Sequence, residues 1–272
     1  MGWLDREATE TQITHRARLW LYLLAVLVMA FLIVPTLIVV PMSFSASQYL
    51  EFPPRQWSLR WYENYFSSAS WLQATATSLK AGALTAVVAT PLGTLAAYGL
   101  FVSRLRAAAL IFTLLVTPMI VPIILVGIAV FYAYVQLKLV NTLLGIVLAH
   151  SVLAIPLVLL IVTSALKSYD MSQEMAARSL GASRPRAFLT VTLPQIRFAV
   201  VTGAILAFLT SFDEIIVAMF VSGGANSTLT RNMFASLRDQ IDPTIAAIST
   251  VMILITSALL ALSQLFGKSE RR

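Results

Sequence analysis

Apolar residues fill six long blocks of this chain, and polar connections separate one block from the next. Each block has roughly twenty residues or more, the length at which a helix rising about 1.5 Å per residue crosses a hydrocarbon core about 30 Å thick. The pattern predicts an all-α fold, a polytopic membrane helix bundle with six transmembrane helices. The expected spans are Leu19–Pro41, Thr75–Phe101, Ala107–Val135, Leu143–Leu166, Ile196–Val221 and Thr244–Phe266.

Lysine and arginine are divided unequally between the two sides of this predicted bundle. Six spans place both termini on one side, where the termini and connections carry thirteen of these residues, whereas the opposite loops carry five. Cytoplasmic loops are the richer in positive charge, so we expect both termini in the cytoplasm. The first apolar block is too long for a signal-peptide core, and we expect it to be retained. The predicted organisation is a cytoplasmic N-terminal segment, residues 1–18, and one transmembrane domain, residues 19–272.

The overall composition agrees with a membrane protein and excludes several other classes. Hydrophobic residues make up 58% of the chain and charged residues 11%, against about 25% charged residues in soluble domains. The net charge of +7 does not indicate nucleic acid as a partner, because the basic residues flank apolar segments. There is no cysteine and there are only two histidines, and no catalytic or metal-ligand cluster stands out. We therefore predict neither catalytic residues nor a metal site.

The longest cytoplasmic connection, residues 167–195, carries start and stop signals for short helices. Asp170 can cap a first helix, and Gly181 can end it with a left-handed backbone conformation. Pro185 suits the beginning of a second helix, and Pro194 closes it at the membrane. The loop is thus expected to be a stiff pair of short helices rather than a flexible linker.

Small residues and a Leu-Pro pair occur at fixed spacing in the same loop. It reads Glu174-Met175-Ala176-Ala177-Arg178-Ser179-Leu180-Gly181, then nine residues, then Val191-Thr192-Leu193-Pro194. This resembles the cytoplasmic-loop signature of permease subunits in binding-protein-dependent ABC importers: Glu-Ala-Ala, a glycine, nine residues, an aliphatic residue, any residue and Leu-Pro. The resemblance implies that the loop docks an ATPase, with Ala176 and Ala177 small enough to seat in a groove. In one departure, Met175 stands where the family has glutamate.

The role of the neighbouring acid, Glu174, is open at this point. In the resembled family the loop glutamate is thought to pair with a basic group of the ATPase. Glu174 could take that role, although a shift of one residue turns a side chain by about 100° around a helix. It could instead bridge to Arg178, four residues further on.

Other segments resemble the polyamine-type branch of these permeases. They are Ser43-Phe44-Ser45, Phe52-Pro53-Pro54, Ser58 to Tyr62, Ser211-Phe212-Asp213-Glu214 and Leu237 to Ala247. The resemblance implies a type I ABC importer permease-like fold in a bacterial inner membrane and a pathway for spermidine or putrescine. It also implies a second homologous permease subunit, two ATPase subunits that bind the ATP, and an extracytoplasmic substrate-binding protein. The chain itself would be non-catalytic, without a cofactor.

Two other assignments compete with this one. Related permeases carry other small solutes, such as iron carriers or thiamine. The other class is an ion-coupled secondary transporter, which would show inverted repeats and broken helices at the midplane, and no such internal symmetry stands out in the sequence.

Polar residues inside the predicted spans are candidates for the transport pathway. Asp213 and Glu214 lie about fifteen residues into the fifth span, and Ser211 precedes them. Adjacent acids are costly in lipid, so they face a cavity that a cation could cross, or the helix ends early and they lie at the headgroups or a subunit contact. We expect His150, in the fourth span, to be a hydrogen-bonded packing residue rather than a ligand.

Two further patterns concern how the spans pack. Ala89, Gly93 and Ala97 form a small-xxx-small stripe on the second span, which predicts close helix packing. Pro118 and Pro122 in the third span are expected to kink that helix.

The outer loop, residues 42–74, is rich in aromatic residues. Aromatic side chains suit the boundary between water and lipid, so a helix lying along the outer surface is expected here. The alternative is a contact face for an extracytoplasmic partner.

Overall fold

The structure is a computed structural model that describes residues 14–103, 105–239 and 241–267, with side chains described up to residue 257. The described residues are largely helical and are connected by turns and loops, and an isolated β-bridge pairs Ser45 with Trp57. The all-α prediction is confirmed. Most of the predicted N-terminal segment, residues 1–18, lies outside the described part of the chain.

The chain divides into two compact units, residues 69–235 and residues 1–68 with 236–272. The single transmembrane domain expected from residue 19 onward stays a prediction. Three helices of the described residues are long and apolar enough to cross a membrane alone, and two bent pairs would bring the number to five. The sixth span and the cytoplasmic position of both termini also stay predictions.

The unit made of the two chain ends contains α1 (Leu19–Met42), α2 (Arg60–Ser67) and α13 (Thr244–Gly267), with the short 3₁₀ helix η2 (His15–Arg18) before α1. Helix α2 lies in the aromatic loop and buries Trp61 and Tyr65. The side chain of Asn64 donates a hydrogen bond to Thr244 Oγ1 at 2.8 Å, which joins α2 to the start of α13. A helix therefore does form in the outer loop, as expected, while its position along a membrane surface stays a prediction.

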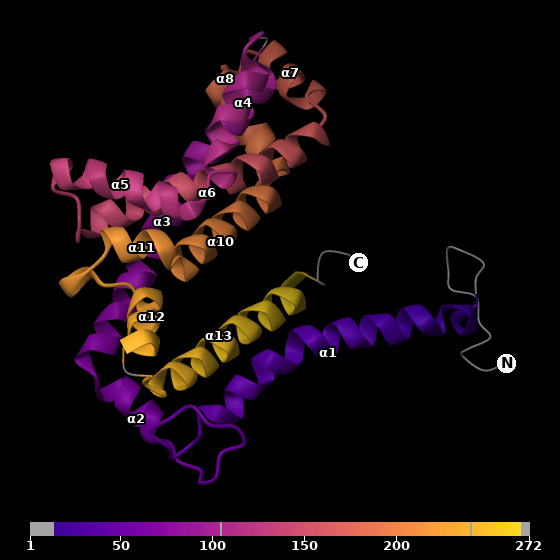
Figure 1. The fold of residues 1–272 in the computed structure, drawn as a ribbon. Helices are drawn as coiled ribbons and strands as arrows, with labels where there is room; N and C mark the ends of the chain where they lie inside the picture. The colour runs from indigo at the N-terminus through magenta and orange to yellow at the C-terminus, as the bar shows by residue number, and fades with distance from the viewer. Residues whose placement is uncertain (1–13, 104, 240, 268–272) are drawn as a thin grey trace. The chain divides into compact units, whose positions relative to one another are not determined.

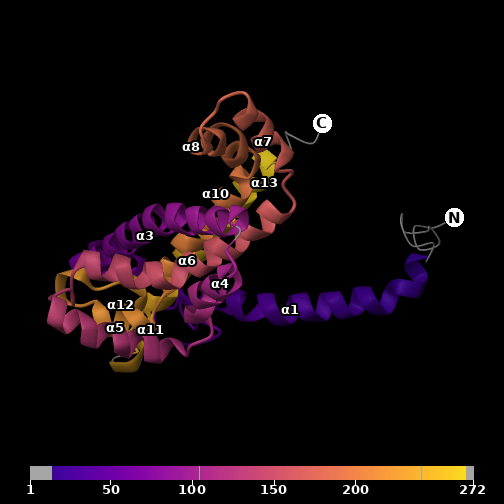
Figure 2. The ribbon, with the colours of Figure 1, turned by 90° about the horizontal axis from the view of Figure 1, so that it is seen from above.

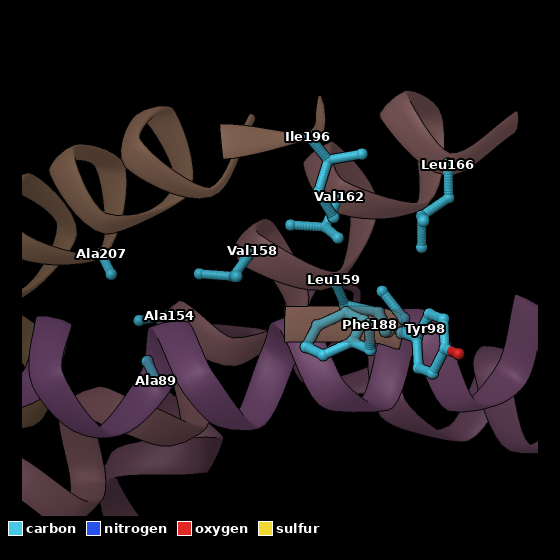
Figure 3. Packing of buried hydrophobic residues seen from close by; sticks show 11 residues of the cluster. Ala89, Tyr98, Ala154, Val158, Leu159, Val162, Leu166, Phe188, Ile196 and Ala207 are labelled. Carbon is cyan, nitrogen blue, oxygen red and sulfur yellow. The ribbon is translucent and has the colours of Figure 1, made fainter. Parts of the chain in front are cut away.

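The core of the unit formed by residues 69–235 is a group of three helices, α3 (Ala69–Val102), α6 (Leu143–Lys167) and α10 (Arg197–Asp213), which pack against one another (Figures 1 and 2). Ala89, Gly93 and Ala97 of α3 are all buried. Their small side chains let the helix backbones approach closely. Figure 3 shows Ala89 facing Ala154 of α6 within this apolar cluster. The predicted packing stripe is confirmed.

The third predicted span, Ala107–Val135, is not a single kinked helix. It consists of α4 (Ala108–Val116) with the 3₁₀ turn η3 (Thr117–Met119), followed by α5 (Ile123–Leu137), and the two parts are bent by 94°. Pro118 lies in η3, and Pro122 directly precedes α5. Proline has no N–H to donate and its ring clashes with the preceding turn, so the helix stops here rather than kinking.

The fifth predicted span, Ile196–Val221, is also interrupted. Helix α10 ends at Asp213, and the short helix α11 (Ile216–Val221) begins after two residues. α11 packs against α5 and α6 around a second apolar cluster that includes Ile146 and Val217. The 3₁₀ turn η5 (Gly224–Asn226) and α12 (Leu229–Asp239) complete the element order before α13.

Candidate functional site

The predicted docking loop, residues 167–195, folds into a series of short helices. They are α7 (Ser172–Ser179), α8 (Arg184–Ala187), the π-helical turn η4 (Phe188–Thr192) and α9 (Leu193–Gln195). Gly181, the second residue after α7, has a φ of +97°, which is the left-handed conformation that glycine adopts without strain. The expected pair of short helices hinged at Gly181 is confirmed, and Figures 1 and 2 show α7 and α8 together beyond the end of α6.

The two ends of this loop are fixed by local chemistry. Asp170 accepts hydrogen bonds from the Ser172 side chain at 2.6 Å and the Ser172 backbone N–H at 2.9 Å. These bonds stabilise the charged form and hold the pKa of the Asp170 carboxyl below its ordinary value. At the other end, Pro194 lies inside α9, one residue before that helix ends, and the chain then turns by 80° into α10.

Several apolar side chains of the loop are exposed. Met175 is 55% exposed, Leu180 90% and Leu189 59%. Leu180 and Gly181 border a shallow hollow of about 360 Å³, whose other lining residues are Ala177, Ala182 and Arg186. We call these residues, with Met175 and Leu189, the docking face. Ala176 and Arg178 are exposed beside it. Apolar side chains gathered at the surface of a polar loop indicate a surface that another protein covers.

Glu174 points the other way. It is fully buried, and it is the one buried residue of α7. Tyr98 Oη donates a hydrogen bond to its Oε1 at 2.6 Å, and Thr192 Oγ1 donates to its Oε2 at 2.5 Å. No ion pair joins Glu174 to Arg178 among the described residues. The outward position that the resembled family gives to glutamate is therefore occupied by Met175 here.

The second half of the motif supports this buried carboxylate. Val191 and Leu193 are half-buried, Pro194 is exposed and Thr192 is fully buried. Phe188, at the start of η4, packs against Tyr98 with ring centroids 4.5 Å apart, as Figure 3 shows. Sequence analysis did not identify Tyr98 or Thr192 as partners of Glu174. Thr192 ends a π-helical turn, a backbone form that is frequent at functional sites.

The predicted pathway residues separate into two environments. Asp213 is exposed, whereas Glu214 and Ser211 are buried. His150 Nδ1 is hydrogen-bonded to Ser211 Oγ at 2.7 Å, and His150 Nε2 lies 3.8 Å from Glu214 Oε2. The prediction that His150 is a hydrogen-bonded packing residue is confirmed.

Glu214 also closes the interruption between α10 and α11. Its Oε1 accepts the backbone N–H of Val217 at 2.9 Å, and its Oε2 accepts that of Ala218 at 2.8 Å. These N–H groups belong to the first turn of α11, where a helix has no internal acceptors for them. Glu214 is thus engaged inside the subunit, and Asp213 alone of the two acids presents its side chain outward.

Comparison with known proteins gives the context for this loop. Residues 89–272 match the family described as binding-protein-dependent transport system inner membrane component. The chain belongs to this family. It is therefore an inner membrane component of a transport system that depends on a binding protein, and the permease resemblance of the loop is confirmed.

Individual relatives cover most of the chain. It is 32% identical over 241 residues to the putrescine transport system permease protein PotI of Escherichia coli (strain K12), which covers 86% of this chain and 85% of PotI. It is 30% identical over 244 residues to the spermidine/putrescine transport system permease protein PotC of Haemophilus influenzae, covering 89% and 94%.

A solved structure has the same fold. It is the crystal structure of a bacterial ABC transporter involved in the import of the acidic polysaccharide alginate, with a TM-score of 0.68 and coverage of 94% of this chain and 98% of that one. At 15% identity this likeness shows the fold alone.

Proposed function

We propose that this chain is the permease subunit of an ATP-driven importer for a polyamine-like cation, spermidine or putrescine. It forms half of the translocation pathway, and a second, homologous permease forms the other half. Two separate ATPase subunits bind the ATP and dock on residues 167–195, and an extracytoplasmic binding protein delivers the substrate. The chain contributes no catalytic residue and requires no cofactor of its own.

The docking face is the observation that carries this proposal. A permease that is driven by a separate ATPase needs a surface that binds the ATPase and a stiff connection from that surface to the transmembrane helices. Leu180, 90% exposed beside a hollow lined by Ala177 and Gly181, supports the first requirement. The short helices on either side of Gly181 support the second, since none of them is separated from the next by a long flexible segment.

The substrate class is supported by two independent features. PotI and PotC carry putrescine or spermidine in their names and match this chain over most of its length. Asp213 presents a carboxylate outward from the end of α10, and a negative charge beside the pathway attracts a cationic substrate. An iron carrier or thiamine would gain less from this charge than a polyamine, whose amines are protonated at neutral pH.

The function is tested by reconstituting the complex of both permeases and the ATPase in vesicles with its binding protein. We expect spermidine or putrescine to stimulate ATP hydrolysis and to accumulate as radiolabel inside, whereas thiamine and iron carriers do neither. Uptake that survives ATP depletion but stops when the ion gradient is collapsed would instead identify an ion-coupled secondary transporter.

A second prediction concerns the docking face itself. Replacing Leu180 by glutamate puts a charge where an apolar side chain is expected to be covered, and an unpaired buried charge is strongly unfavourable. We expect the amount of ATPase that copurifies with the permease to fall by about tenfold or more, equivalent to about 1.4 kcal/mol of binding free energy. Leu180→Met is the matched control and should retain the ATPase. Equal retention by both variants would remove Leu180 from the contact.

A further inference from the structure

Helix α7, which carries Met175 and Ala177 of the docking face, buries a single side chain against the rest of its unit, and its exposed Gln173 accepts a hydrogen bond from the Gln195 side chain of α9 at 3.3 Å. Of the eight residues of α7, only Glu174 is buried. The residues next to it, Gln173 and Met175, are exposed. A carboxylate loses its hydration when it is buried, and it is retained in such a place only where hydrogen bonds replace the lost water. Because Glu174 is buried, a contact with a docked partner does not explain why a carboxylate is present at this position.

The two oxygens of Glu174 hold two different elements. Oε1 is bonded to Tyr98, one turn before α3 ends at Val102. Oε2 is bonded to Thr192, the last residue of η4, from which the chain continues through α9 into α10. Helices α3 and α10 pack directly against each other in the three-helix core. One carboxylate thus joins α7 directly to α3 and, through η4 and α9, to α10.

The kind of contact matters for how motion is passed on. The burial of apolar surface favours contact without a preferred direction. Short hydrogen bonds to a carboxylate are strong and directional, so they resist both separation and sideways movement. Tyr98 is held in turn by the contact of its ring with the ring of Phe188 in η4, tilted by 44° with centroids 4.5 Å apart. A pull on α7 therefore reaches α3 through Tyr98 and reaches α10 through Thr192.

We propose that Glu174 is a positioning residue that transmits ATP-driven motion from α7 into α3 and α10, and that it does not contact the ATPase. This inference rests on the proposed function, because it needs an ATPase docked on the loop. It assigns different roles to two adjacent residues: Met175 faces the ATPase, and Glu174 connects α7 to the helices α3 and α10.

The test is the number of substrate molecules taken up per ATP hydrolysed by the reconstituted complex. The variants are Glu174→Gln, which keeps the shape of the side chain but turns one acceptor into a donor, Tyr98→Phe and Thr192→Val. Two controls make the same changes elsewhere: Tyr134→Phe, in the second apolar cluster, and Thr202→Val, whose hydroxyl bonds only within its own helix.

We expect all three variants to retain the ATPase on copurification and to hydrolyse ATP, while uptake per ATP falls about fivefold or more, the lower range of coupling between distinct sites. Both controls should keep the wild-type ratio. Because Tyr98 acts through Glu174, the variant that combines Tyr98→Phe with Glu174→Gln should take up as much substrate per ATP as Glu174→Gln alone. A role limited to stability would lower hydrolysis and uptake in parallel and leave their ratio unchanged.

The outcomes separate this inference from the proposed function. An unchanged ratio in Tyr98→Phe and Thr192→Val overturns the coupling role, even where Glu174→Gln fails to assemble. Loss of the ATPase from an otherwise folded Glu174→Gln complex would also overturn it, because Glu174 would then be a docking residue. A wild-type complex that shows no ATP-driven uptake overturns the proposed function, and the coupling role with it.

Discussion

Replacing Glu214 by alanine is expected to cost the subunit roughly 2–4 kcal/mol of folding free energy, because two buried backbone N–H groups lose their acceptor. The carboxylate accepts the N–H groups of Val217 and Ala218 at the start of α11. Water cannot easily replace it, since Glu214 is buried beside His150. Glu214→Gln keeps one carbonyl oxygen and should lose about half as much.

The adjacent acid provides the matched comparison. Asp213 is exposed at the end of α10, so Asp213→Asn should leave folding and assembly unchanged. It should lower the uptake of a cationic substrate if its charge lies beside the pathway, as proposed. Substitutions of the two adjacent acids are thus expected to have different effects: loss of the Glu214 carboxylate lowers stability, and loss of the Asp213 charge lowers transport.

The measurements are the apparent melting temperature of the purified complex in detergent and the initial rate of polyamine uptake in vesicles. Unfolding of membrane complexes is commonly irreversible, so all variants are compared at one heating rate. A Glu214→Ala protein that melts with the wild type would show that the carboxylate does not hold α11. Unchanged uptake by Asp213→Asn would remove that acid from the pathway.

The sequence anticipated those features that depend on composition along a single helix. The boundaries of the first span, Leu19–Pro41, differ by one residue from those of α1, Leu19–Met42. The fourth span agrees equally closely with α6. Both are uninterrupted apolar helices, so the average hydropathy of a window locates them. The helix-ending role of Gly181 was also predictable, because few other residues accept a φ of +97°.

The directions of the helix axes were not predictable from average hydropathy. A hydropathy window registers apolar content but not a change of axis, so two segments bent by 94° were expected as one span. Pro118 and Pro122 were the available signal for that break. At Glu214 no proline or glycine marks the interruption. The signal there was the pair of acids itself. A carboxylate that is buried in an apolar segment needs donors, and the free N–H groups at the start of a new helix supply them.

The orientation of Glu174 was beyond sequence reasoning for a related reason. The motif fixes spacing along the chain, and adjacent residues on a helix point about 100° apart. The spacing of the motif did not indicate which of Glu174 and Met175 turns inward. That choice depends on Tyr98 and Thr192, which lie 76 and 18 residues away in the chain.

The second large effect is expected at Gly93, in the centre of the three-helix core. A Cβ atom built at this position would lie 2.7 Å from Val158 Cβ and 3.1 Å from the backbone oxygen of Ile155, both on α6. Val158 is fully buried, and its Cγ1 is also 3.3 Å from a Cβ placed at Gly203 of α10. Val158 therefore fills the space that glycines of two neighbouring helices leave open.

Gly93→Ala should destabilise the complex by about 1–3 kcal/mol, because α6 has to move away and give up contacts with α3 and α10. Gly99→Ala is the control on the same helix: a Cβ there meets nothing within 4 Å, and alanine favours the helix by up to about 1 kcal/mol. The melting temperature should fall for Gly93→Ala and stay level or rise for Gly99→Ala.

A second substitution identifies the cause of that loss. Val158→Gly removes the Cβ and Cγ1 atoms that the new methyl group would approach at 2.7 and 2.8 Å. Alone, it leaves a cavity and is destabilising. Combined with Gly93→Ala, the two changes should cost less than their sum, because the added methyl occupies part of the space that the valine vacates. Strictly additive losses would mean that Gly93 is required for helix geometry rather than for its contact with Val158.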